Sequence, residues 1–156
     1  TGQLLELPFP AGKAIDALSK KGSGKEFFRV KVQDMSFSLS GVQNKVEAYH
    51  QGNDAETAAY ALRCLIGAIV EATKNALREY PAAMVVFAGG VASNSALRAA
   101  MKQACDEAGI ALCYPSPIFC TDNAAMIASQ GYYEYMAGTR HDLDLNAIPN
   151  LKIGQR

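Results

Sequence analysis

The sequence has little of several features that mark common classes of protein. No apolar run approaches the roughly 18 residues that a helix needs to span a bilayer. The N-terminal stretch "TGQLLELPFPAGK" has neither the basic start nor the long apolar core of a signal peptide. Fifteen Lys and Arg balance 15 Asp and Glu, and no basic block stands out. These absences argue against a membrane partner and against nucleic-acid binding by a broad basic surface, although a local basic patch stays open.

Signatures of common catalytic sites are also missing. The only histidines, His50 and His141, form no HxxxH or HExxH pair, and both are expected at the surface. The chain contains no GxxxxGK[ST] loop, no GxGxxG turn and no GxSxG elbow. A P-loop, a dinucleotide fingerprint and a serine nucleophile are therefore not indicated.

Cysteine usage indicates a reducing compartment. The four cysteines are irregularly spaced, form no CxxC pair and lie in apolar or helical contexts: Cys64, Cys105, Cys113 and Cys120. Such a pattern favours reduced, mostly buried thiols over disulfides or a metal cluster. We therefore expect a cytoplasmic protein. The absence of an initiator Met favours a processed or excised chain.

The length and composition describe one domain, or part of a larger one, that can bury a core. The chain has 156 residues, of which 49% are hydrophobic and 19% charged. After a short helix over 13–20, the apolar periodicity predicts the order β-β-α-β-α-β-α, and hence a layered α/β/α domain. The elements are two hairpin strands in 25–32 and 36–41, a helix over 53–80, a strand over 83–89, a helix over 94–108, a strand over 110–115 and a helix over 121–138, followed by an irregular tail over 139–156.

The two later strand-to-helix junctions are the candidate site. The continuous apolar run over 83–89 predicts a central strand covered on both faces. Gly89–Asn94 follows this strand, and Pro115–Asp122 follows the strand over 110–115. Both should open at the carboxyl edge of the sheet, where ligands of open α/β sheets bind.

Each junction has two interpretations. Gly89 and Gly90 in "FAGGVASNSALRAAM" suit either tight packing or close approach of a ligand, and Asn94 suits a helix cap or a ligand contact. In "CTDNAAM", Thr121 or Asp122 is expected to cap the last helix, while a metal ligand is the alternative for Asp122.

Four segments in order resemble the C-terminal half of the tRNA threonylcarbamoyladenosine synthases, long called O-sialoglycoprotein endopeptidases or glycoproteases. "LPFPAGKAIDALSKKG" resembles the family's Y-P-G-G-P-A-I-(D/E)-x-L-A stretch, and "MSFSLSGVQNKV" resembles F-S-F-S-G-L-K-T. "FAGGVASNSALRAAM" is similar to G-G-V-A-A-N-x-x-L-R, and "FCTDNAAMIA" to C-T-D-N-G-A-M-I-A. Together they extend from about residue 7 to 130.

The resemblance implies a fold and a set of site residues. The family has the actin/Hsp70-like ATPase fold, so residues 1–156 would be the C-terminal lobe of a two-lobe protein. An adenine nucleotide or acyl-adenylate would lie against Gly89 and Gly90 and contact Asn94, Gly12 and Asp16, with Asp16 on the ribose hydroxyls. Asp122 would be one ligand of an Fe or Zn ion. The histidines that complete this site belong to the family's N-terminal lobe, so this chain alone would hold an incomplete metal site.

The resemblance also implies a reaction. The family transfers the threonylcarbamoyl group from threonylcarbamoyl-AMP to adenosine 37 of tRNA, with the metal ion as a Lewis acid. Four departures from the family segments put the acceptor substrate in question: Ala11, Lys13, Gln43 and Asn44. The sequence indicates no catalytic residue.

Two other functions remain open. One is the metallopeptidase activity after which the family was first named, for which the sequence offers no zinc-protease signature. The other is an inactive paralogue that scaffolds a partner as a homodimer or a paralogue heterodimer. The interface would then come from the helix over 53–80 and from the Tyr-rich last helix, whose tyrosines are expected to pack against another helix rather than to stack on bases.

Overall fold

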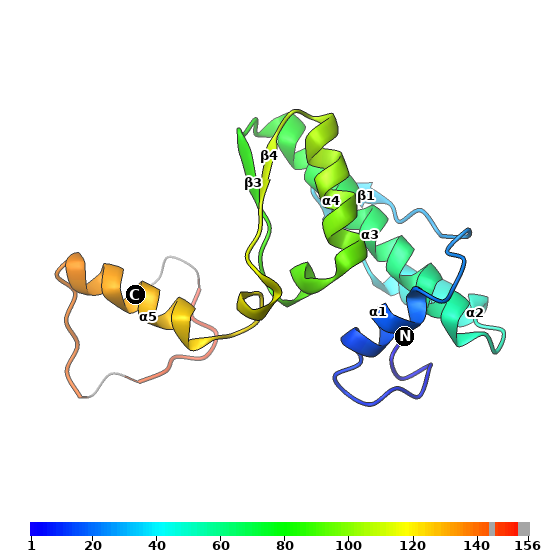
Figure 1. The fold of residues 1–156 in the computed structure, drawn as a ribbon, viewed down its shortest axis with the longest axis horizontal. Helices are drawn as coiled ribbons and strands as arrows, with labels where there is room; N and C mark the ends of the chain where they lie inside the picture. The colour runs from blue at the N-terminus through cyan, green and yellow to red at the C-terminus, as the bar shows by residue number, and fades with distance from the viewer. Residues whose placement is uncertain (144–145, 153–156) are drawn as a thin grey trace. The chain divides into compact units, whose positions relative to one another are not determined.

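The computed structural model describes residues 1–143 and 146–152 (Figure 1). The chain divides into two compact units, Thr1–Cys120 (unit 1) and Thr121–Arg156 (unit 2). Both units carry helices, and unit 1 carries strands as well, so the predicted mixed α/β class is confirmed. In the part of the irregular tail that the structure describes, 139–143 and 146–152, no helix or strand forms; 144–145 and 153–156 lie outside the described residues.

The elements of unit 1 follow the predicted order with one added helix. They are α1 (Gly12–Ser19), β1 (Val32–Gln33), β2 (Ser36–Phe37), α2 (Ser40–Tyr49), α3 (Asp54–Glu79), β3 (Met84–Val86), a 3₁₀ turn (Gly90–Ser93), α4 (Ser95–Glu107), β4 (Ala111–Cys113) and a second 3₁₀ turn (Pro117–Phe119). Unit 2 contains α5 (Ala124–Met136).

Helix α3 is the central element of unit 1. Its N-cap is Asn53, whose side chain accepts a hydrogen bond from the Glu56 N–H. Small apolar residues run along its buried side and let α1, α2 and α4 pack against it. The ring of Tyr60 stacks on that of Tyr49 from α2, with centroids 4.1 Å apart. His50, predicted at the surface, is half-buried, and its ring nitrogen Nδ1 lies 2.9 Å from the Thr57 hydroxyl.

The predicted hairpin forms, but with shorter strands than expected. β1 pairs with β2 in antiparallel register, Val32 opposite Phe37, while residues 25–31 run without regular structure. The segment 38–41 was expected to continue the second strand and instead leads into α2. Val42 and Val46 explain this helix, because they lie four residues apart and both are buried in the core.

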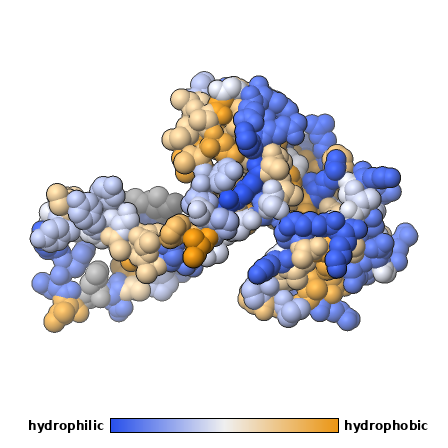
Figure 2. All heavy atoms as spheres, viewed as in Figure 1, coloured by the Kyte–Doolittle hydropathy of each residue, from blue (hydrophilic) through white to orange (hydrophobic). Residues whose placement is uncertain are grey.

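Strands β3 and β4 pair in parallel, with Val85 opposite Leu112. The prediction that β3 is covered on both faces is wrong: Met84 is 52% exposed and Val86 66% exposed. Helix α4 packs against β4, and Figure 2 shows hydrophobic side chains gathered on the surface of the pair of strands. The parallel pairing nevertheless gives both strands a common carboxyl edge.

Unit 2 contains one helix that is exposed on all sides. α5 has no buried residue, and its tyrosines, expected to pack, are 60%, 66% and 61% exposed at Tyr132, Tyr133 and Tyr135. Its N-cap is Asn123, whose side chain accepts a hydrogen bond from Met126 N–H at 3.0 Å. The predicted cap at Thr121 or Asp122 is therefore wrong by one or two positions.

The cysteines are free thiols, as predicted. Cys64, Cys105 and Cys120 are buried, and Cys113 on β4 is exposed. None of the helices in the described residues combines the length and the apolar character that crossing a bilayer requires.

Candidate functional site

The turn after β3 begins with a glycine in a conformation that other residues avoid. Gly89 has φ +93° and ψ 168°, and the chain then enters the 3₁₀ turn that starts at Gly90. The sequence predicted a turn here that requires glycine. Gly89 confirms it, because a residue without a Cβ adopts positive φ at little cost. Since β3 and β4 are parallel neighbours, this turn and the chain leaving β4 at Tyr114 start from the same edge.

Packing does not explain the glycine at position 89. A Cβ added to Gly22 would collide with the Ala55 carbonyl of α3, which is the mark of a glycine needed for close packing. A Cβ added to Gly89 would meet no atom within 4 Å among the described residues, and the same holds for Gly12. Both glycines, like Gly90, are exposed. Positive φ, and not close packing, therefore accounts for glycine at position 89, and the ligand contact stays a prediction.

Asn94 has two functions in this structure, one at each end of its amide. Its Oδ1 accepts a hydrogen bond from Leu97 N–H at 2.9 Å and so caps α4. Its Nδ2 donates to Asp16 Oδ1 at 2.7 Å, across 78 residues of sequence. The cap fixes the amide in place, and the amide in turn fixes the carboxylate. Two of the six sequence-predicted site residues are thereby in direct contact.

The Asp16 carboxylate is oriented from both sides. Its Oδ2 accepts a hydrogen bond from Lys20 Nζ at 2.8 Å, one helical turn along α1. The Asp16 side chain is 22% exposed, so part of the carboxylate still faces solvent. Gly12 lies one turn before Asp16 on α1. The helix therefore brings an oriented carboxylate to Asn94, at the end of the turn. Lys20 was not predicted, and no motif in the sequence indicates it.

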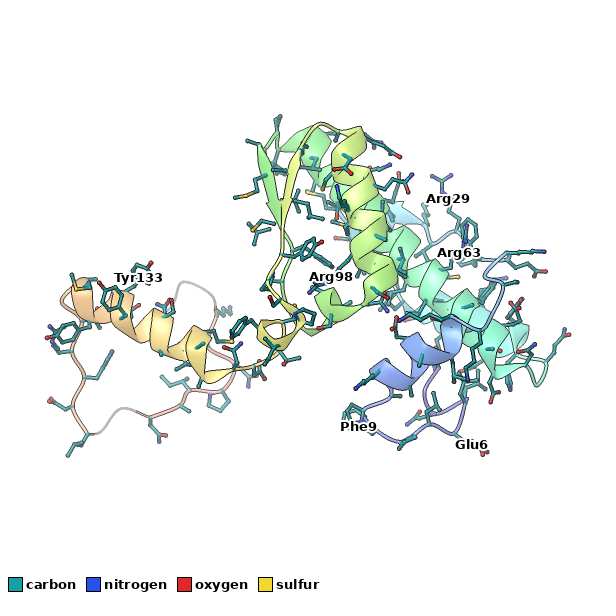
Figure 3. The ribbon with its side chains drawn as sticks, in the orientation of Figure 1. Glu6, Phe9, Arg29, Arg63, Arg98 and Tyr133 are labelled. Carbon is teal, nitrogen blue, oxygen red and sulfur yellow. The ribbon has the colours of Figure 1, made fainter. Side chains whose placement is uncertain are left out.

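Arg98 is the main residue that the sequence analysis missed. It lies one turn after Asn94 on α4, and its Nε–H donates to the Ala92 carbonyl within the 3₁₀ turn (Figure 3). Its Nη2 donates to the Pro115 carbonyl at 3.0 Å and to Cys120 Sγ at 3.1 Å. The guanidinium also lies over the Tyr114 ring, 4.5 Å from its centroid. One side chain thus joins the segments that follow β3 and β4.

Asp122 belongs to unit 2, where Asn123 takes the capping role and leaves Asp122 exposed. Among the described residues, no three His, Cys, Asp or Glu side chains gather in a way that could hold a metal ion. A single carboxylate fits one ligand position of an Fe or Zn ion and leaves the others to residues outside this chain. That is what the resemblance implied, and the assignment stays a prediction.

The four departures from the family segments lie on exposed or helix-starting positions. Ala11 is the N-cap of α1 and has no side-chain cap bond, and Lys13 is exposed in the first turn. Gln43 donates to Glu47 at 3.1 Å along α2, and Asn44 is exposed on the same helix. None of the four carries a core contact, so their effect would be on what binds to the surface.

Comparison with known proteins identifies the relatives of this chain. The family described as TsaD, tRNA N6-adenosine threonylcarbamoyltransferase, matches residues 1–129. A protein of that name from Carboxydothermus hydrogenoformans is 40% identical over 161 aligned positions, covering 99% of this chain and 48% of the relative. The namesake from Symbiobacterium thermophilum is 41% identical and covers 95% of this chain and 46% of the relative. One from Clostridium botulinum is 38% identical, with 96% and 48% covered. The chain spans about half the length of these curated relatives.

Proposed function

The chain belongs to the tRNA N6-adenosine threonylcarbamoyltransferase family, and we propose that it forms the adenylate-binding lobe of such an enzyme. The proposed reaction moves the threonylcarbamoyl group from threonylcarbamoyl-AMP to the exocyclic nitrogen of adenosine 37 in tRNA. The acyl-adenylate and tRNA are accordingly the proposed partners. The peptidase and scaffold alternatives have no comparable support from the names of the relatives.

The observation that carries the proposal is the hydrogen bond between Asn94 and Asp16. It joins two segments that local structure alone would not bring together, at 2.7 Å. Each segment also carries a glycine with open space around it, Gly12 four residues before Asp16 and Gly89 five residues before Asn94. A carboxylate beside exposed backbone N–H groups suits a nucleoside monophosphate, which presents hydroxyl donors at one end and anionic acceptors at the other.

The proposed roles follow from the donors and acceptors. Asp16, held by Asn94 and Lys20, accepts the ribose hydroxyls with the part of its carboxylate that remains exposed. Gly89 and Gly90 let the phosphate approach the main chain at the start of α4. These residues bind and orient the acyl donor, and catalysis gains from that positioning. A bound Fe or Zn ion, with Asp122 as one ligand, would supply Lewis acidity at the acyl group.

We place the enzyme in the cytoplasm, where its tRNA substrate occurs and where the buried, unpaired thiols remain reduced. Dimerisation stays a prediction. The buried side of α3, expected to contribute the interface, is used for packing within unit 1.

The test uses two asparagine caps in the complete protein. Asn94→Ala removes the cap of α4 and the bond to Asp16, whereas Asn53→Ala removes only the cap of α3. We expect Asn94→Ala to weaken AMP binding, measured by titration calorimetry, by about tenfold or more, as for a lost hydrogen bond to a charged group. Asn53→Ala should bind AMP like the wild type while losing a similar amount of stability, about 1 kcal/mol.

Equal AMP affinity in the wild type and in Asn94→Ala would remove this pair from the nucleotide site. The reaction itself is tested with purified tRNA and threonylcarbamoyl-AMP, by mass spectrometry of the digested nucleosides. A complete, folded protein that leaves adenosine 37 unmodified under these conditions would refute the transferase assignment.

A further inference from the structure

We propose that Arg98 is a positioning residue, which links the adenylate-binding turn after β3 to the segment that leads from β4 toward Asp122. The inference rests on the proposed function and adds a residue to it. It is carried by an arrangement within unit 1: a single guanidinium donates to a carbonyl on each of the two segments. The backbone pairing of β3 with β4 ends at the bond from Phe87 N–H to the Cys113 carbonyl, before either segment begins.

The first contact of Arg98 fixes the turn that carries Gly89 and Gly90. Its acceptor is the carbonyl of Ala92, the residue at the centre of this turn whose side chain is fully buried. The turn also has short-range bonds, from Ala92 N–H to Gly89 and from Asn94 N–H to Val91. Those local bonds shape the turn, and Arg98 connects its Ala92 carbonyl to the Pro115 carbonyl of the segment after β4.

The second set of contacts fixes the other segment. Pro115 has no N–H and Pro117 opens the next turn, so few backbone donors are available there. Arg98 Nη2 supplies a donor to the Pro115 carbonyl and to the buried Cys120 sulfur. The Tyr114 ring, 4.5 Å from the guanidinium, holds its plane in the orientation that serves both segments.

An arginine is required for this arrangement. The Nε–H and Nη2–H groups are separate donors held at fixed positions in one rigid plane, so one side chain can donate to two segments simultaneously. A lysine at the same position carries its donors on one nitrogen and reaches one segment at a time. Because Asp122 follows Cys120 by two residues, the link also sets where the chain leaves unit 1.

The test compares Arg98→Met with Lys102→Met in the complete protein. Lys102 lies one turn further along α4 and pairs with Asp106 on the exposed side, so it controls for loss of a cation from the same helix. Hydrogen exchange of ligand-free protein should rise in peptides covering 89–94 and 115–120 of Arg98→Met, with α3 unchanged. The KM for threonylcarbamoyl-AMP should rise about tenfold while the KM for tRNA stays the same. Lys102→Met should match the wild type in both measurements.

The outcomes separate this inference from the proposed function. Wild-type exchange in both segments, wild-type KM, or an equal rise in exchange throughout unit 1 would each overturn the positioning role. Should Arg98→Met fail to fold, Arg98→Lys decides, and wild-type behaviour of that variant overturns the proposal. A wild-type protein that binds no AMP would refute the proposed function, and the ligand-free exchange data would still judge the Arg98 link.

Discussion

Helices α4 and α5 are alike in length and cap, and they differ in almost everything that packing decides. Each has 13 residues and an asparagine N-cap, Asn94 for α4 and Asn123 for α5. α4 gathers its apolar residues on one side and buries them: Leu97, Met101, Ala104 and Cys105. α5 carries apolar residues around its circumference and buries none. Local sequence is enough to form and start both helices, whereas the contacts of a helix depend on residues far away in the chain.

The two caps show the same contrast at the level of single side chains. The Nδ2 group of the Asn123 amide donates to the Thr121 carbonyl, two residues away, at 2.9 Å. The corresponding end of Asn94 reaches Asp16 on α1. In these bonds the same residue type at the same helix position donates to a neighbour two residues away in unit 2 and across 78 residues in unit 1.

The largest expected effects separate the proposed metal ligand in unit 2 from the proposed ribose ligand in unit 1. In the complete protein, Asp122→Ala should lose most of its bound Fe or Zn and its transferase activity, because one anionic ligand is removed. Its AMP affinity should change little. Asp16→Ala should keep the metal and weaken AMP binding by about tenfold or more.

Metal content by plasma mass spectrometry and AMP affinity by calorimetry measure the two effects on the same samples. The comparison would break if Asp122→Ala kept its metal, or if Asp16→Ala lost it. Far-UV circular dichroism controls for unfolding of either variant.

Core truncation should separate the two helices next. Leu97 is 1% exposed on α4, and Ile127 is 70% exposed on α5. Leu97→Ala should lower the free energy of unfolding of the 156-residue chain by about 2–5 kcal/mol, because it leaves a cavity. Ile127→Ala should change it by less than about 0.5 kcal/mol. Urea titrations monitored by circular dichroism measure both, and equal losses would mean that α5 packs as tightly as α4.

Measuring Leu97→Ala and Ile127→Ala again in the complete protein sharpens the comparison. An Ile127→Ala loss that appears only there would assign the partner of α5 to residues outside this chain. The same small effect in both would mean that α5 stays exposed.

The sequence predicted the elements whose signals are local. The period of α3 placed that helix to within a residue at each end, and "FAGG" predicted a turn needing glycine, where Gly89 has positive φ. Predictions from the sequence were wrong where a pattern was short or fitted both a strand and a helix. "SFSLSG" alternates like a strand, but only Ser36–Phe37 pairs, because Val42 and Val46 draw the next residues into α2. The exposure of Met84 and Val86 on β3 could not be predicted either. A continuous apolar run looks the same in the sequence whether or not other elements cover the strand.

The candidate site was predictable only in part, for the same physical reason. The resemblance supplied Asp16 and Asn94 as separate positions, and their contact emerged from the fold. Arg98 matches the last residue of the family's G-G-V-A-A-N-x-x-L-R segment, but the motif gave it no role, and its contacts with both strand ends emerged only from the fold. Asp122 was weighed mainly as a cap, and the neighbouring Asn123 takes that role.

Thiol reactivity should divide the cysteines of unit 1 between its surface and its core. Cys113 is exposed on β4, whereas Cys64 is buried on α3 and accepts a hydrogen bond from Phe28 N–H. Burial raises the pKa of the Cys64 thiol, so less of the reactive thiolate forms. With an aromatic disulfide reagent at pH 8, Cys113 should react roughly a hundredfold faster than Cys64, which reacts only after local opening.

Cys113→Ser identifies the fast phase in stopped-flow absorbance. Loss of the slow phase instead would reverse the assignment, and a single rate for all thiols would mean that the core of unit 1 opens freely.

The smallest expected effect concerns an acidic contact at the edge of unit 1. Glu56 accepts hydrogen bonds from the Ser23 N–H at 2.7 Å and the Ser23 hydroxyl at 3.0 Å, and these bonds lower the pKa of its carboxyl. A lowered pKa stabilises the fold above the unfolded-state value, about 4.3, and this contribution is lost as pH falls through the folded value. Glu56→Gln should therefore melt slightly below the wild type at pH 7 and level with it near pH 3. Glu26→Gln, from the adjoining exposed segment, is the control for removing a charge. If the difference in melting temperature between Glu56→Gln and the wild type persisted unchanged at pH 3, the charge of Glu56 would not be what stabilises this contact. The shape of the side chain would then account for how Glu56 holds the segment before β1 against α3.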